Sequence, residues 1–405
     1  MSSIEEKFSR DSIASREGKV RLVDSDPDNG LDLFCYNTCS NSEEEFVKKC
    51  RGLVFHGDTL VMKAFPYTNE YSHKDLENIE PILADFSKWS FYTSHEGALL
   101  RLFNFSGKWF LTTHRKLNAF RSKWASNNSF GSLFKRALEN EAKHNVPFRE
   151  TLKEGENILD KFQNSLDKNK QYMFLLCNDA DNRIVCKPPS RHMLYHVGTF
   201  SDGVLSLESN LTIPFPEKLT YNNIDELLES IDRELDPMLF QGVICFGPDN
   251  KQVKILHDRY QQLFQVRGNE SSIKFRYLQV RMNRKTREML YFLYPNMINV
   301  FETYENSLYS VAKNIYNCYV ARYINKEFII LPREEFSVMA TCHAHYLEDH
   351  QNKISVEKVI EIMNTQTPTN LNRMIKRLQA EKRGVPAPEE STEVVEPTPL
   401  DLALE

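Results

Sequence analysis

Short apolar runs separated by turn residues occupy the chain from Leu31 to about Val266. Runs of this kind, rich in aromatic and β-branched residues, are typical of β-strands. Helical periodicity lies between them, at residues 129–144, 150–163 and 224–235. The mixture predicts an α+β domain built around antiparallel sheet over residues 31–270. We expect the strands that line its cleft at residues 51–56, 60–65, 89–94, 98–104, 108–113, 172–177, 182–186, 242–246 and 252–256.

The pattern changes at about Ser272, where apolar residues begin to recur at three- and four-residue spacing. This spacing predicts helices over residues 305–324, from Pro332 onward, and from an N-cap at Ser355. We therefore expect a mainly helical C-terminal domain over residues 271–382. Residues 1–30 are polar and are predicted to be poorly ordered. Residues 383–405 are rich in proline and acids and are predicted to form a disordered tail.

Composition indicates the number of domains, the absence of a membrane span and the cellular location. The chain has 405 residues, of which 41% are hydrophobic, which suffices for two domains. No apolar run approaches the roughly 18 residues of a membrane span, and the polar start does not resemble a secretory signal. Eight scattered cysteines favour free thiols in a reducing compartment, so a cytoplasmic location is predicted. The net charge of −5 means that nucleic-acid contact would have to come from local basic patches.

Several short segments occur in an order that is informative together. They are Lys49-Cys-Arg-Gly52, Thr93-Ser-His-Glu-Gly97, Asp181-Asn-Arg-Ile-Val185, Gln241-Gly-Val-Ile244 and Val253-Lys-Ile-Leu256. In these segments the chain resembles the bacteriophage-type RNA ligases, the RNA ligase 1 family of ATP-dependent nucleotidyltransferases. It resembles in particular the RNA-ligase-like proteins of large cytoplasmic DNA viruses, of the iridovirus and African swine fever virus type.

The resemblance implies an antiparallel-sheet nucleotidyltransferase domain with an ATP-grasp-like ligase cleft, followed by a helical domain. It implies ATP and Mg²⁺ as cofactors and Arg51, Glu96 and Lys254 as nucleotide-binding residues. It also implies RNA as the partner and, for a viral protein, the host cytoplasm or the virion as its location.

The chain departs from this family at the charged positions. Ser94 occupies the place of the lysine nucleophile, Leu176 and Gln241 replace two glutamates, and Leu256 replaces the second lysine of a Lys-x-Lys pair. A ligase needs an amine to attack the α-phosphate, and serine is a poor substitute without an adjacent base. We therefore predict a catalytically impaired pseudo-ligase that binds RNA ends or nucleotide. No catalytic residue is assigned, and the degenerate positions are Ser94, His95, Glu96, Gly97 and Gln241.

Two alternatives remain open from the sequence. One is an active ATP-dependent RNA ligase with a relocated nucleophile, for which His95, Lys63 and Lys116 are candidates. Strand alternation predicts, however, that His95 points away from the face shared by Ser94 and Glu96. The other alternative is a structural or virion-associated interaction protein.

Two basic segments are candidates for RNA contact, because cations attract phosphates and aromatic faces can stack on bases. The first spans residues 114–124, in which Phe120 and Trp124 could instead form the buried stripe of a helix. The second spans residues 274–287, near the predicted domain boundary. The predicted RNA-binding residues are Arg115, Lys116, Arg121, Lys123, Trp124, Arg281, Arg284 and Lys285. Cys342-His-x-His345 matches no closed zinc pattern, so no metal site is predicted.

Overall fold

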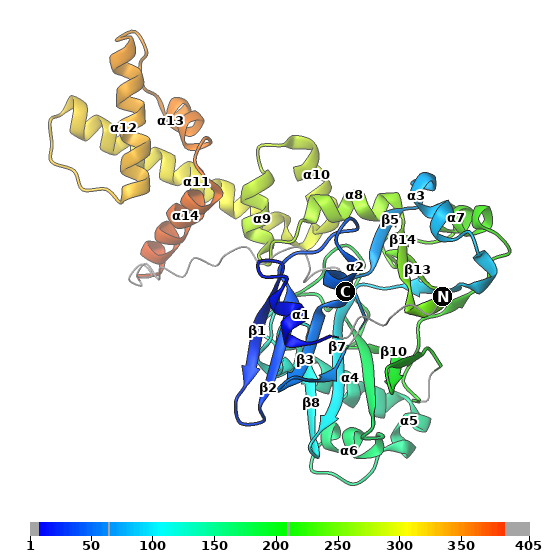
Figure 1. Cartoon of the computed structure of the whole chain (residues 1–405). Helices are drawn as coiled ribbons and strands as arrows, with labels where there is room; N and C mark the ends of the chain where they lie inside the picture. The colour runs from blue at the N-terminus through cyan, green and yellow to red at the C-terminus, as the bar shows by residue number, and fades with distance from the viewer. Residues whose placement is uncertain (1–7, 64, 209–210, 385–405) are drawn as a thin grey trace. The chain divides into compact units, whose positions relative to one another are not determined.

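The computed structural model describes residues 8–63, 65–208 and 211–384. The chain divides into two compact units, with the boundary between Gln265 and Val266 (Figure 1). The first unit mixes helices with antiparallel sheet, and the described part of the second is helical. The predicted α+β class with a helical C-terminal part is therefore confirmed.

The first unit contains three sheets. The first has the order β1-β2-β3-β4, the second β11-β10-β9-β7-β8 and the third β12-β6-β13-β14-β5. Every pair is antiparallel except β5 and β14, which are parallel. The strands are β1 Val20–Asp26, β2 Leu31–Tyr36, β3 Arg51–His56, β4 Thr59–Met62, β5 Asn69–Ser72, β6 Ser90–Ser94, β7 Gly97–Phe105, β8 Lys108–Thr112, β9 Lys170–Cys177, β10 Leu194–Ser201, β11 Val204–Ser206, β12 Lys218–Leu219, β13 Gly242–Phe246 and β14 Gln252–Leu256.

Helices cover two of these sheets from outside. Helices α3 and α7 pack on the third sheet, where Ile79 and Leu227 join a buried cluster with Val243 and Ile255. Helix α4 lies against β9, and the rings of Phe134 and Phe174 are 5.3 Å apart. The helices of this unit are α1 Arg10–Ala14, α2 Glu45–Lys49, α3 Leu76–Ile82, α4 Phe130–His144, α5 Val146–Thr151, α6 Ile158–Ser165 and α7 Ile224–Arg233, and α8 Asp258–Arg267 crosses into the second unit.

The second unit is organised around α11, whose residues Leu308, Val311 and Ile315 are buried. Helix α13 begins where the sequence predicted, because the Ser355 side chain accepts a hydrogen bond from the Lys358 amide. Within the described residues, no helix is long and apolar enough to cross a membrane. The unit's helices are α9 Ile273–Val280, α10 Arg284–Leu293, α11 Ile298–Tyr319, the π-helical turn η5 Val320–Ile324, α12 Arg333–Glu348, α13 Val356–Met363 and α14 Pro368–Arg383.

Three local predictions are wrong. Residues 182–186 form no strand, because the amides of Val185 and Cys186 donate to the Glu96 carboxylate instead of to a neighbouring strand. The N-terminal segment is ordered where it is described, since Val20 is buried and β1 pairs with β2. The helix predicted over residues 150–163 is broken into α5 and α6. The predicted tail, from residue 385 onward, lies outside the described residues.

A buried arginine joins the first and second sheets. Arg101 of β7 is fully buried, and its guanidinium donates to the carbonyl oxygens of Gly52 (2.6 Å) and Thr113 and to the hydroxyl of Thr112 (3.2 Å). Gly52 has φ of 71°, and a Cβ at this position would overlap with Nη1 of Arg101. Glycine is therefore required here by the backbone conformation and also by the arginine.

We expect Arg101→Met to lower the free energy of unfolding by about 2–4 kcal/mol, because it leaves buried carbonyl oxygens without donors. Gly52→Ala should also lower the free energy of unfolding, because the added Cβ would displace the Arg101 guanidinium from the same contact. Urea denaturation measures both, with Arg21→Met as the matched control because Arg21 is exposed on β1. The control should change stability by less than about 0.5 kcal/mol. Equal effects of the Arg101 and Arg21 variants would contradict the assignment.

Candidate functional site

One cavity of about 280 Å³ lies in the first unit, lined by residues from all three sheets. Part of its wall is aromatic: the ring of Tyr92 lies 5.5 Å from that of Phe215 and 5.8 Å from that of Phe246, and Phe65 lies 6.0 Å from Phe246. Another part is polar and is formed by Arg51, Thr68, Glu70, Gln252 and Lys254. The cavity therefore combines flat apolar surface with charged groups, as small-molecule sites commonly do.

Ser94 lies in this cavity at the end of β6, the place where the family resemblance implies a lysine. Its hydroxyl donates to Oε1 of Gln241 at 2.9 Å. The backbone fixes this pair, because the Gln241 amide donates to the Ser94 carbonyl at 2.8 Å just before β6 and β13 pair. The structure thus brings together Ser94 and Gln241, and Lys254 lines the same cavity.

Glu96 does not line the cavity but is turned into the protein. Its carboxylate accepts hydrogen bonds from the amides of Val185 and Cys186 and from the hydroxyl of Tyr260 (2.9 Å). Burial raises the pKa of Glu96 to about 7, while these hydrogen bonds and nearby Arg183 act in the opposite direction. Gly97 beside it is confined, since a Cβ there would overlap with the Leu176 carbonyl oxygen.

A directional chain of hydrogen bonds connects these two positions. Ser94 donates to Gln241, Nε2 of Gln241 donates to the Tyr260 oxygen at 2.9 Å, and Tyr260 donates to Glu96. The Ser94 proton is therefore directed away from the cavity, and the Ser94 oxygen faces it as an acceptor.

His95 contradicts the prediction from strand alternation. Strand β6 ends at Ser94, so the two-residue period does not continue, and His95 lines the cavity together with Ser94. Its ring stacks on Tyr195 at 4.5 Å, and Nε2 lies 3.0 Å from the Thr93 hydroxyl. Burial lowers the pKa of His95 to about 4, so the ring is neutral at pH 7.

The cations of the cavity are held in place. Nζ of Lys254 lies 3.1 Å from the carboxylate of Glu70, its register partner on β5, and Nη1 of Arg51 donates to the Pro66 carbonyl at 3.0 Å. Gln252 shares the cavity-facing side of β14 with Lys254, whereas Leu256 is buried outside the lining. The second polar position of this strand is thus two residues before Lys254, not two residues after it as the resemblance implied.

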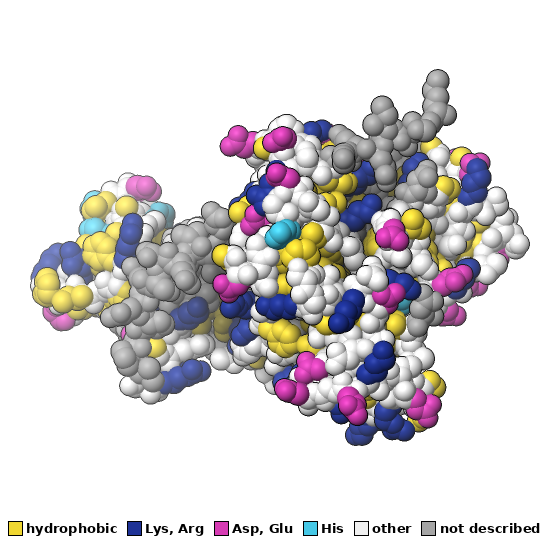
Figure 2. Space-filling model, turned by 60° about the horizontal axis from the view of Figure 1, so that its bottom comes forward, with side chains coloured by type: hydrophobic (Ala, Val, Ile, Leu, Met, Phe, Trp, Pro, Cys, Tyr) yellow, Lys and Arg dark blue, Asp and Glu magenta, His cyan; other side chains and the backbone are white. Residues whose placement is uncertain are grey.

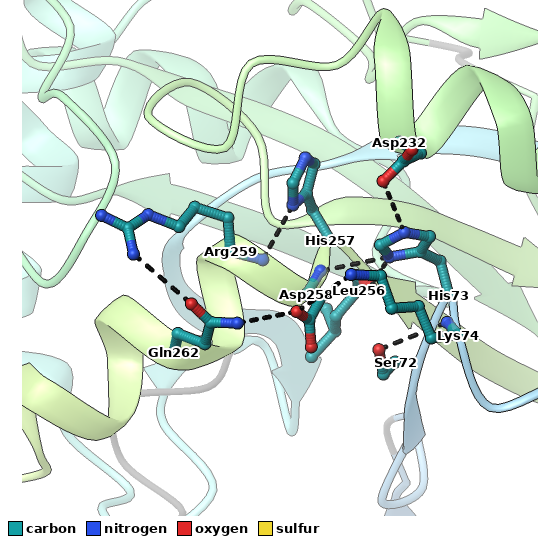
Figure 3. Close-up of polar contacts among 9 residues, drawn as sticks. All are labelled: Ser72, His73, Lys74, Asp232, Leu256, His257, Asp258, Arg259 and Gln262. Carbon is teal, nitrogen blue, oxygen red and sulfur yellow. Dashed lines mark hydrogen bonds and ion pairs between the residues drawn. The ribbon is translucent and has the colours of Figure 1, made fainter.

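A polar cluster fixes the parallel pair that carries Glu70 and Lys254 (Figure 3). His73 follows β5, and its amide donates to the Leu256 carbonyl at the end of β14. Its Nδ1 accepts from the Asp258 amide at 3.1 Å, so Nε2–H donates to Asp232 at 3.0 Å. This hydrogen bond lowers the pKa of Asp232. The cluster ties the ends of β5 and β14 to α7 and so sets the Glu70–Lys254 register.

The basic segments differ from their prediction. Trp124 is 6% exposed, which argues against the stacking role and agrees with the alternative that it is a core residue. It lies outside any helix, and Phe120 is 42% exposed, so the two do not form a buried helical stripe. Arg115 donates to the Asn37 carbonyl at 3.0 Å, and Lys116 lies 3.6 Å from Asp24. Arg281 makes two hydrogen bonds to the Glu305 carboxylate, at 2.7 and 2.8 Å, and is largely buried. These side chains stabilise the units internally.

Four of the predicted RNA-binding side chains are exposed: Arg121, Lys123, Arg284 and Lys285. Arg284 pairs with Glu288 at 2.8 Å. On the face shown in Figure 2, Lys and Arg side chains are interspersed with Asp and Glu, which does not form a continuous positive track.

Sequence reasoning missed Gln252, Glu70 and Tyr260 as parts of this site. The two-residue period of β14 could have placed Gln252 beside Lys254, since both face one side of the strand. Nothing in the local sequence indicates that Glu70 meets Lys254, because β5 and β14 are far apart in the chain.

The raised pKa of Glu96 predicts a pH dependence of stability. From its usual value of 4.5 to about 7, the folded protein holds the proton more tightly than the unfolded chain. The group's contribution therefore falls as pH rises through this window, by roughly 3 kcal/mol at most. Glu96→Gln should remove this fall. Denaturation of both proteins from pH 4.5 to 8 measures the difference, in which the other titrating groups cancel. A difference that stays constant with pH would contradict the prediction.

No family model matches the chain. It is 27% identical over 334 residues to the immediate-early protein ICP-46 homolog of Invertebrate iridescent virus 6, covering 79% of this chain and 71% of that protein. It is 28% identical over 356 residues to the homolog of Invertebrate iridescent virus 3, covering 84% and 75%. Immediate-early protein ICP-46 of Frog virus 3 is 26% identical over 274 residues, covering 63% and 64%.

Two solved structures are similar to this chain at lower sequence identity. A putative ATP-dependent DNA ligase from Aquifex aeolicus is 12% identical with a TM-score of 0.38, covering 72% of this chain and 73% of that one. An archaeal ATP-dependent RNA ligase is 12% identical with a TM-score of 0.40, covering 70% and 69%. The sequence relatives are iridovirus proteins, the type of virus that the resemblance named.

Proposed function

We propose that this chain is an RNA-ligase-like pseudoenzyme, which binds nucleotide or RNA ends in the cavity of its first unit without forming a lysine–AMP bond. The observation that carries the proposal is the state of Ser94. In the place of the attacking lysine stands a hydroxyl whose proton is donated to Gln241, inside a cavity that also contains Arg51 and Lys254. The iridovirus relatives support a viral origin, and we propose that the chain acts in the host cytoplasm.

The remaining groups do not restore the missing chemistry. Among the described residues that line the cavity, Lys254 is the one lysine, and it is paired with Glu70. Lys63 and Lys116 do not belong to the lining, which disfavours both as relocated nucleophiles. Each electrostatic contact removed from such a site costs on the order of 3 kcal/mol of transition-state stabilisation.

The donor set also does not fit Mg²⁺. Within residues 8–63, 65–208 and 211–384, no three or more His, Cys, Asp or Glu side chains are grouped so that they could hold a metal. Glu70 is engaged by Lys254 and Glu96 by backbone amides, and Gln241 lacks the charge that a hard cation favours.

A second candidate function follows from His95. Its neutral ring lines the cavity, so a ring nitrogen could attack the α-phosphate of ATP, break the bond to the bridging oxygen and release pyrophosphate, which would give a histidine–AMP phosphoramidate. This candidate would make the chain a nucleotidyltransferase with a relocated nucleophile.

The two functions differ in whether AMP becomes covalently attached. We expect no gel-stable adduct when the protein is incubated with α-labelled ATP and Mg²⁺ or Mn²⁺ and separated by denaturing electrophoresis. An adduct lost in His95→Phe would support the histidine candidate, and one lost in Lys254→Met would support the lysine. Either result would overturn the pseudoenzyme proposal. Tyr309→Phe, on the exposed surface of the second unit, is the neutral control.

RNA binding is expected to be weak in sequence preference and strongly salt-dependent. Replacing Arg121 and Lys123 by alanine should flatten the slope of log K against log salt by about one unit or slightly more, since each charge contributes about 0.7. Filter binding of a labelled single strand at several salt concentrations measures this. Replacing Lys88 and Arg233 removes the same charge from exposed ion pairs elsewhere in the unit and is the matched control. Equal slopes for the two double variants would remove residues 121–123 from the RNA surface.

A further inference from the structure

One buried donor in the cavity has no partner. Gln252 is 7% exposed and lines the cavity from β14. Its Oε1 accepts a hydrogen bond from the Thr68 hydroxyl at 3.3 Å. Its Nε2 has no hydrogen-bond partner in the described part of the chain. An unpaired buried amide is destabilising, so its presence in a cavity wall indicates an acceptor that arrives with a ligand.

The charge around this donor is small. The lining contains two cations, Arg51 and Lys254, and one carboxylate, Glu70, which lies 3.1 Å from Lys254. His95 adds no charge at pH 7, because burial lowers its pKa to about 4. The polar wall therefore has a surplus of a single positive charge, because Glu70 offsets the charge of one of the two cations.

The cavity is small and partly aromatic, which limits the kind of ligand that fits it. Its volume of about 280 Å³ lies just below the roughly 300–1,000 Å³ that ligand sites usually span. The aromatic wall of Tyr92, Phe215 and Phe246 offers faces on which a base can pack. A cavity of this size and lining suits a small ligand with an aromatic ring, such as a nucleotide.

We propose that the cavity takes a nucleoside 5′-monophosphate and discriminates against triphosphates. The phosphate lies against Nε2 of Gln252 and Nζ of Lys254, and the base packs on the aromatic wall. Each further phosphate adds negative charge for which the lining has no cation. The donor set offers no metal site in the described residues to neutralise it. This inference rests on the proposed nucleotide-binding function and specifies its ligand class.

Calorimetry on the full chain tests the inference with AMP, adenosine, inorganic phosphate, and ATP with and without Mg²⁺. We expect AMP to bind at least about tenfold more tightly than adenosine, the effect of one hydrogen bond to a charged group. ATP should bind more weakly than AMP, and Mg²⁺ should not reverse the order.

Gln252→Leu tests the residue itself. It should bring AMP affinity close to that of adenosine and leave adenosine affinity unchanged. The melting temperature should fall only slightly, because the one hydrogen bond that is lost is the 3.3 Å bond from the Thr68 hydroxyl to Oε1. Gln252→Lys should raise ATP affinity relative to AMP by adding a cation. Gln171→Leu is the matched control: its amide donates to the Val61 carbonyl and lies outside the cavity lining, so it should lower stability and leave all affinities unchanged.

The outcomes separate the two proposals. If ATP with Mg²⁺ binds tenfold or more tightly than AMP, or if Gln252→Leu leaves AMP affinity unchanged, the monophosphate inference is overturned while the nucleotide site stands. If neither AMP, ATP nor adenosine binds, the proposed nucleotide-binding function fails and the inference fails with it.

Discussion

The guanidinium of Arg101 is the interaction on which the arrangement of the first unit depends. A cation without exposure to water is unfavourable unless its donors are satisfied, and here backbone carbonyls of β3 and of the residue after β8 accept them. The same contacts join the first sheet to the second and hold Arg51, whose carbonyl is 3.3 Å from Nη1 of Arg101, at the edge of the cavity. Gly52 is required for this contact, since any side chain there would displace the guanidinium.

Ser94, Gln241, Tyr260 and Glu96 are linked by one chain of hydrogen bonds. Tyr260 has one proton, which it donates to Glu96, and its oxygen accepts from the amide of Gln241. A glutamate at position 241 would place a carboxylate oxygen against the phenol oxygen of Tyr260, whose one proton is already donated to Glu96. Glutamine at 241 therefore fits a site in which Glu96 is retained, and a serine at 94 fits an amide oxygen that accepts a proton. The positions form one hydrogen-bonded unit whose polarity is set by the buried carboxylate.

Arginines in the basic segments are bound by groups within the protein. Arg115 and Arg281 looked like phosphate ligands because they stand in basic stretches, yet both are engaged by groups far away in the sequence, at Asn37 and Glu305. A guanidinium has five donors in a fixed fork, so it is as useful for tying segments together as for binding phosphate. The cavity follows the same rule, since Arg51 donates to the Pro66 carbonyl and Lys254 lies 3.1 Å from the Glu70 carboxylate.

The sequence by itself determined most strands, the helical character of the second unit, the N-cap at Ser355, and the neighbourhood of Ser94, Gln241 and Lys254. These follow from local periodicity, capping chemistry and the order of short motifs, which are properties of adjacent residues. Tertiary structure alone decided that Glu96 turns inward, that Glu70 meets Lys254 through a parallel pair, and that Trp124 is buried. It also decided that residues 182–186 give their amides to a carboxylate instead of a strand. Each of these depends on which distant segment supplies the partner for a buried polar or aromatic group, and local sequence does not encode that choice.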